Sequence, residues 1–166
     1  MSEAALKADS HEFYRQLAQE LEGLLAGEHD AIANAANTAA LLFERLPDVN
    51  WAGFYFLRQG GVLVLGPFQG RPACVRLPAG RGVCGAAVVQ RSSVRVADVH
   101  AFADHIACDS ASRSELVVPL IRDGELLGVL DLDSPHIGRF SPADQAGLEQ
   151  VAALFAPSAY APACAG

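Results

Sequence analysis

The chain has 166 residues, of which 51% are hydrophobic and 19% are charged, and 12 Lys and Arg against 19 Asp and Glu give a net charge of −7. This length is typical of one domain with its own core, and the apolar content excludes a mostly disordered chain. The excess of acidic residues argues against a protein that binds nucleic acids or anionic lipids through clustered Lys and Arg.

The first third of the sequence is predicted to be helical. Ser10 can cap a helix that Gly27 ends, and a second, Ala-rich helix is expected from about Asp30 to Leu46, just before Pro47. The apolar residues that recur at helical spacing in the first helix are Phe13, Leu17, Leu21 and Leu24.

The sequence then changes to the alternating pattern of strands. We expect strands at 51–57 and 62–66, joined at Gly60-Gly61, followed by a short strand at 73–77. A helix is expected at 82–91 and another short strand at 94–96. The polar segment 98–114 is predicted to be irregular, with one helical turn.

The last third predicts a hairpin and a final helix. Strands are expected at 115–121 and 125–132, joined by Asp123-Gly124, and Ser141, Pro142 and Asp144 carry the capping signals of a helix. Hairpins imply antiparallel pairing. We therefore predict an α+β fold with a central antiparallel sheet flanked by helices, the N-terminal helices on one side. We expect residues 1–156 to form a single domain and residues 157–166 to form a tail.

Gly80, Gly82 and Gly85 match the G-x-G-x-x-G pattern of dinucleotide-binding proteins, and Asp104 lies about where a ribose-binding acid would. The context argues against that function, because Pro78 interrupts the preceding strand and the neighbouring strands form hairpins. A tight turn entering a helix is the simpler interpretation. The N–H groups at that helix start are also suited to a carboxylate.

The chain has four cysteines, which are Cys74, Cys84, Cys108 and Cys164. It has no apolar run of about 20 residues, as a membrane span needs, and no signal-peptide pattern. We therefore expect a cytoplasmic protein whose cysteines are thiols, ligands or redox groups rather than structural bridges. Their spacing is too wide for a zinc knuckle, and we expect no metal site. A site joining His105 to the cysteines, and burial of the cysteines as small apolar residues, remain alternatives.

Cys108 is the cysteine least typical of a core, because it lies in a polar segment without apolar periodicity. Such a thiol is more plausibly reactive than buried. His105 can assist its ionisation or can simply be exposed.

Two carboxylates, Asp131 and Asp133, lie two residues apart in a predicted strand and therefore share a face, while Leu130 and Leu132 face the core. They form either a solvated strand end or a paired acid site for an ammonium or another cation. Glu115 begins the neighbouring strand and can reach the same cleft, or it can be exposed.

Trp51 and Tyr55 share one face of the strand at 51–57. They either pack in the core or form a wall for an apolar group of a ligand.

Three segments carry a resemblance to a known family: GPFQGRPACVRLPAGRGVCG, ADVHAFADHIACDSASRSELVVPL and GVLDLDSP. They strongly resemble the free methionine-R-sulfoxide reductases, which are stand-alone GAF-domain enzymes, and the resemblance covers about residues 12–156. It implies a GAF fold and the thiol-dependent reduction of free L-methionine-(R)-S-oxide to L-methionine. The alternative is a GAF module that binds a small ligand and signals without catalysis.

The resemblance also assigns roles to residues. Cys108 matches the nucleophile, Cys74 the resolving cysteine that forms a disulfide with it, and Cys84 an accessory cysteine, while Cys164 matches no family position. Trp51 resembles the aromatic residue that lines the methyl pocket. The carboxylates that match the family's substrate contacts are Glu115, Asp131 and Asp133.

The chemistry of the family agrees with these residues. A thiolate attacks the sulfoxide sulfur, and the sulfoxide oxygen must gain protons, so a carboxylic acid with a raised pKa is required. Glu115 is the candidate acid and Asp131 its competitor. A sulfenic acid on Cys108 would be captured by Cys74 and reset by thioredoxin, with NADPH supplying electrons through thioredoxin reductase. No bound cofactor is expected, and the amphipathic N-terminal helices and the family suggest a homodimer.

Overall fold

The structure is a computed structural model that describes residues 11–158. The Ser10 cap, Cys164 and most of the expected tail lie outside these residues. Its α-helices are α2 (His11–Leu25), α3 (Ala31–Arg45), α4 (Gly82–Gln90) and α5 (Pro142–Phe155). Its strands are β1 (Trp51–Leu57), β2 (Leu63–Gly70), β3 (Arg76–Leu77), β4 (Val94–Val96), β5 (Ser114–Arg122) and β6 (Glu125–Ser134).

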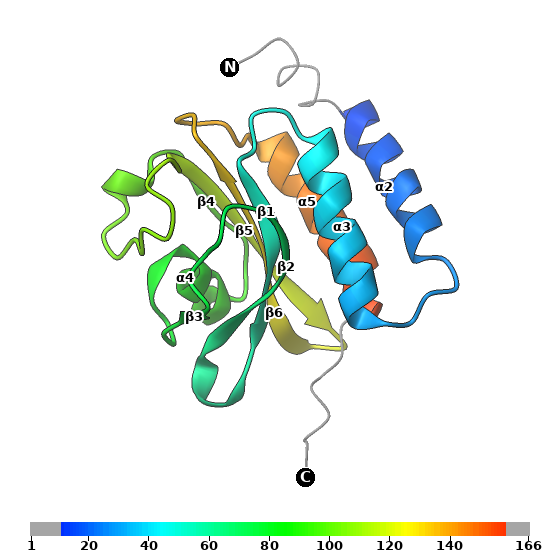
Figure 1. Cartoon of the computed structure of the whole chain (residues 1–166), viewed down its shortest axis with the longest axis horizontal. Coiled ribbons are helices and arrows are strands. Elements are labelled where there is room, and N and C mark those ends of the chain that lie inside the picture. Colours follow the sequence, from blue (N-terminus) through cyan, green and yellow to red (C-terminus); the bar gives the residue numbers. More distant parts are fainter. Residues whose placement is uncertain (1–10, 159–166) are drawn as a thin grey trace.

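The six strands form one antiparallel sheet in the order β3-β2-β1-β6-β5-β4. Helices α2, α3 and α5 cover one face, and α4 with the connection between β4 and β5 covers the other (Figure 1). The predicted α+β architecture, with the N-terminal helices on one side, is confirmed. No helix in residues 11–158 is long and apolar enough to cross a membrane.

Alternation along the central strands divides the apolar residues between two clusters. Ala52 and Phe54 of β1 pack under the three helices, where the rings of Phe54 and Phe155 lie 4.4 Å apart. Trp51 and Tyr55 point to the opposite face, into the cluster beneath α4. The predicted shared face of this aromatic pair is therefore confirmed.

The second and third strands differ from their predicted bounds. β2 continues to Gly70, beyond the expected end at residue 66, although Pro67 lies in the extension. β3 pairs with β2 only at Leu63 and Val64, so the later residues of β2 have one neighbouring strand and tolerate a proline. The expected strand at 73–77 is reduced to Arg76–Leu77, although the Val75 carbonyl still accepts a hydrogen bond from the Leu65 N–H of β2, 2.9 Å.

The hairpin strands are also longer than predicted, and β6 continues to Ser134, two residues beyond the expected end at residue 132. The turn into α5 is confirmed as a capping box, in which Ser141 and Asp144 each accept a hydrogen bond from the other's backbone N–H. Asp144 also forms a buried ion pair with Arg139, 2.8 Å, and accepts a hydrogen bond from the Tyr14 hydroxyl, which fixes α2 against α5.

Candidate active site

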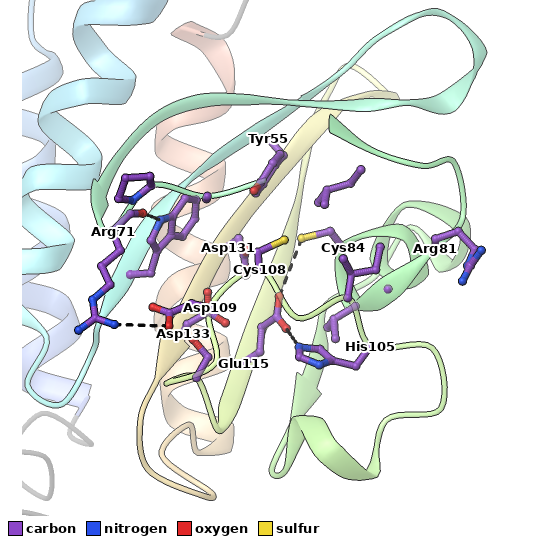
Figure 2. Close-up of a pocket in the computed structure, with 18 residues that line it drawn as sticks. Tyr55, Arg71, Arg81, Cys84, His105, Cys108, Asp109, Glu115, Asp131 and Asp133 are labelled. Atoms are coloured by element: carbon purple, nitrogen blue, oxygen red, sulfur yellow. Dashed lines mark hydrogen bonds and ion pairs between the residues drawn. The ribbon is translucent and has the colours of Figure 1, made fainter. Parts of the chain in front are cut away.

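A cavity of about 50 Å³ opens on the α4 face of the sheet (Figure 2). Its walls come from the ends of β1, β5 and β6, the first turn of α4, and the connections that follow β2 and β4. Every site residue predicted from the sequence lines it except Cys74: Trp51, Tyr55, Cys84, Cys108, Glu115, Asp131 and Asp133.

The cysteines fall into two kinds. Cys74 and Cys108 form a disulfide with their Cα atoms 5.5 Å apart, and this bond joins the segment after β2 to the segment before β5 across 34 positions of sequence. This is the pair that the family resemblance implies. Cys84 keeps a free thiol, which is 4% exposed and lies 4.0 Å from Glu115 Oε1. Burial and the nearby carboxylates raise the pKa of this thiol well above its ordinary value.

The sheet register brings the three carboxylates together. Glu115 on β5 pairs with Asp133 on β6, and Val117 pairs with Asp131, so all three acids share the face beneath α4. Asp131 is 5% and Glu115 7% exposed. The interpretation of Asp131 and Asp133 as a solvated strand end is therefore wrong, and so is that of Glu115 as an exposed residue.

The position of these acids raises their pKa values. Burial, followed by the charges of the other two acids, raises the pKa of Glu115 well above its ordinary value. Burial likewise raises the pKa of Asp133, and it raises that of Asp131 to about 6. Hydrogen bonding to Glu115 and Cys84 offsets part of this effect at Asp131.

His105 lies beside this group rather than in solvent. Its side chain is 14% exposed, and its Nε2 is 4.0 Å from Glu115 Oε2. The alternative of an exposed histidine is therefore wrong. Burial, with His100 nearby, lowers the pKa of His105 and favours the neutral imidazole.

Aromatic rings form one wall of the cavity. The ring of Trp51 stacks on those of Phe68, 5.2 Å, and Tyr55, 5.9 Å between centroids, and its indole N–H donates to the Arg71 carbonyl, 3.1 Å. The Tyr55 hydroxyl donates to the Cys74 carbonyl, 2.8 Å, and so holds the segment that carries this cysteine. Phe68 supports the Trp51 ring but does not line the cavity, and it was not predicted because the second strand was expected to end at residue 66.

Two arginines at the rim connect the cavity walls to the segment that carries Cys108. The Arg81 Nε–H donates to both carboxylate oxygens of Asp104, at 2.9 and 2.8 Å. Arg71 Nη1 lies 3.9 Å from Asp109 Oδ1 (Figure 2). Asp104 also accepts a hydrogen bond from the Gly82 N–H, 3.3 Å. The start of α4, which the sequence suggested as a site for a carboxylate, therefore already binds a carboxylate of the protein itself. Hydrogen bonding to Arg81 lowers the pKa of Asp104.

The buried acids predict a stability that falls as the pH rises. Because the pKa of Asp131 is higher in the folded chain than in the unfolded chain, its favourable contribution is complete at acid pH and is lost as the pH rises through about 6. The Asp131→Asn substitution should therefore raise the free energy of unfolding at pH 8 by about 1–3 kcal/mol. At pH 4 it should give no gain.

Urea unfolding of the two proteins at both pH values measures this difference. Glu125→Gln, which removes an exposed carboxylate from the same strand, is the matched control and should change little at either pH. A loss of stability in Asp131→Asn at pH 8 would contradict this electrostatic account.

Comparisons with known proteins agree with the geometry. Residues 9–158 match the GAF domain family. The chain is 55% identical to the free methionine-R-sulfoxide reductase of Escherichia coli over 86% of each chain, and 39% identical to that of Saccharomyces cerevisiae over 88% of this chain and 85% of the other. It superposes with a TM-score of 0.86 on the Neisseria meningitidis free methionine-R-sulfoxide reductase in complex with its substrate, at 45% identity over 95% and 91% of the two chains. The protein belongs to the GAF-domain family of free methionine-R-sulfoxide reductases.

Proposed function

We propose that this protein reduces free L-methionine-(R)-S-oxide to L-methionine, with Cys108 as the nucleophile. The observation that carries the proposal is the meeting, in one cavity, of a redox-capable cysteine pair, three acids and an aromatic wall. The membership of the family supports the same reaction.

The cavity offers a complementary group for each part of a free amino acid. The substrate ammonium suits the carboxylates of Asp131 and Asp133, and its S-methyl group suits the face of Trp51. Its carboxylate suits the first-turn N–H groups of Val83 and Cys84, which line the same cavity. A methionine sulfoxide within a peptide lacks both the free ammonium and the free carboxylate, so these contacts favour the free amino acid.

The reaction transfers one oxygen atom from the substrate to the enzyme. The Cys108 thiolate attacks the sulfoxide sulfur while the Glu115 carboxyl group protonates the oxygen. Transfer of that oxygen reduces the sulfoxide to a thioether by two electrons and oxidises Cys108 to a sulfenic acid. The Cys74 thiol then attacks the Cys108 sulfur, releases water and forms the disulfide.

Recycling requires an external dithiol, because the electrons come from thiols and not from a bound cofactor. Thioredoxin, supplied by NADPH through thioredoxin reductase, is the reductant we propose, in the cytoplasm where such dithiols are kept reduced. A single domain over residues 1–156 would carry this activity. We also infer a homodimer, because Leu24, Ile32 and Phe43 expose apolar surface on α2 and α3.

A coupled assay of NADPH consumption with thioredoxin and thioredoxin reductase tests this function. Turnover is expected with the free R epimer, and not with the S epimer or with a peptide-bound sulfoxide. An absence of turnover, with dithiothreitol also failing as the donor, would overturn the proposal in favour of a ligand-binding GAF module.

A further inference from the structure

Cys84 is the buried thiol that the reaction above leaves unused, and it does not stand alone. Its Sγ, one oxygen of Glu115 and one oxygen of Asp131 all lie within 4.8 Å of one another, at the floor of the cavity. The Cys74–Cys108 disulfide leaves this thiol reduced, so the cluster persists in the oxidised protein.

An unpartnered oxygen points to a missing ligand in this cluster. Asp131 Oδ1 is buried and has no hydrogen-bond partner, although the residue is 5% exposed. A buried polar atom without a partner is costly, and a bound cation would remove that cost. In residues 11–158, His105 is the one basic side chain within ion-pair range of the three residues, through Glu115 at 4.0 Å.

The donor set selects the kind of cation. Mg²⁺ and Ca²⁺ prefer shells made of oxygen alone, whereas a thiolate with carboxylates and an imidazole nearby suits zinc. The cavity of about 50 Å³ holds a few waters, since each water needs about 10–15 Å³ of such space, and it therefore has room for one ion.

We propose that Cys84, Glu115 and Asp131 form a binding site for Zn²⁺, with a water or His105 in the fourth position. This set differs from the cysteine–histidine site weighed from the sequence, because the disulfide removes Cys74 and Cys108. Binding displaces the protons of Cys84 and Glu115 and places the metal where the ammonium of methionine would bind. Zinc and methionine therefore compete, and this last consequence rests on the proposed function.

Cobalt titration of the oxidised full-length Cys164→Ser protein tests the site. In that protein Cys84 is the only thiol, so a thiolate-to-cobalt charge-transfer band can come from no other residue. We expect a band that saturates at one equivalent of Co²⁺, is abolished by Zn²⁺ and is unaffected by excess Mg²⁺. Absence of the band, or saturation only far above one equivalent, would overturn the proposal whether or not the protein proves to be a reductase.

Two variants and one control assign the ligands. Cys84→Ser should lose the band. Asp131→Asn should weaken zinc binding by roughly 10- to 100-fold, because loss of a residue that only supports a metal ligand already lowers affinity by that much. Glu125→Gln should bind as the parent does. Near-ultraviolet circular dichroism of Trp51 verifies that each variant is folded, and unchanged zinc affinity in a folded Asp131→Asn protein would contradict the assignment.

Zinc binding measured with and without methionine tests the metal site separately from the proposed reductase activity. Added methionine should lower the apparent zinc affinity if both occupy the cavity. Stoichiometric zinc binding that methionine does not disturb would contradict the shared position, while leaving the three-ligand site supported by the band itself.

Discussion

The Cys108→Ser protein is expected to produce no methionine from free methionine-R-sulfoxide, whereas Cys74→Ser is expected to produce one equivalent and then stop. Serine cannot attack the sulfoxide sulfur at neutral pH, so the first substitution should lower the rate by at least about 10³-fold. Without Cys74 the first oxygen transfer still occurs, but no second thiol captures the sulfenic acid at the observed disulfide position. Quenched-flow measurement of methionine per protein chain distinguishes the two results.

The Cys164→Ser protein is the matched control for this pair, because it also replaces a cysteine by serine but at a position that matches no cysteine of the family. This protein should complete many turnovers with thioredoxin. A trapping reagent specific for sulfenic acids should label Cys108 in the Cys74→Ser protein. Full turnover by Cys74→Ser with thioredoxin would assign the resolving role elsewhere, with Cys84 as the remaining thiol beside the cavity.

The Glu115→Gln protein is expected to lose about 10²- to 10⁴-fold in kcat/KM, the range that a positioned general acid contributes. Glutamine keeps the shape of the side chain but cannot give up the proton that the sulfoxide oxygen needs. The raised pKa of Glu115 keeps this carboxyl group protonated to a higher pH than an ordinary glutamate. The rate of the parent should therefore fall as the pH rises through that pKa, and this decline should be absent from Glu115→Gln.

Asp131→Asn is the comparison that separates the two candidate acids. Because its pKa is about 6, Asp131 is mostly ionised at neutral pH and suits the substrate ammonium better than proton donation. We expect this substitution to raise KM more than it lowers kcat. If Glu115→Gln kept the pH-dependent decline and Asp131→Asn lost it, the two roles would be exchanged.

Short-range patterns predicted the faces of the sheet. The Asp123-Gly124 turn and the alternation of residues in 125–132 placed Asp131 and Asp133 on one face and the leucines on the other, as observed. The same alternation in β1 placed Trp51 and Tyr55 together. These predictions hold because a strand has a period of two whatever it packs against.

Contacts that depend on irregular segments could not be predicted in the same way. The pairs Arg81–Asp104 and Arg71–Asp109 join residues whose separation is set by the path of the segment between β4 and β5, which has no periodicity. The burial of Glu115 and Cys84 likewise depends on α4 lying over the sheet. The sequence thus indicated that the acids, the aromatic pair and the cysteines share one site. The packing of α4 over the sheet determines the pKa values that give these residues different chemistry.

One anaerobic single turnover tests the central claim most directly. Fully reduced Cys164→Ser protein is mixed with one equivalent of free methionine-R-sulfoxide, and its thiols, methionine yield and disulfide map are measured together. The account predicts one methionine, the loss of two of three thiols, and a bond between Cys74 and Cys108 with Cys84 still reduced. Retention of all three thiols, with the sulfoxide recovered unchanged, would contradict it.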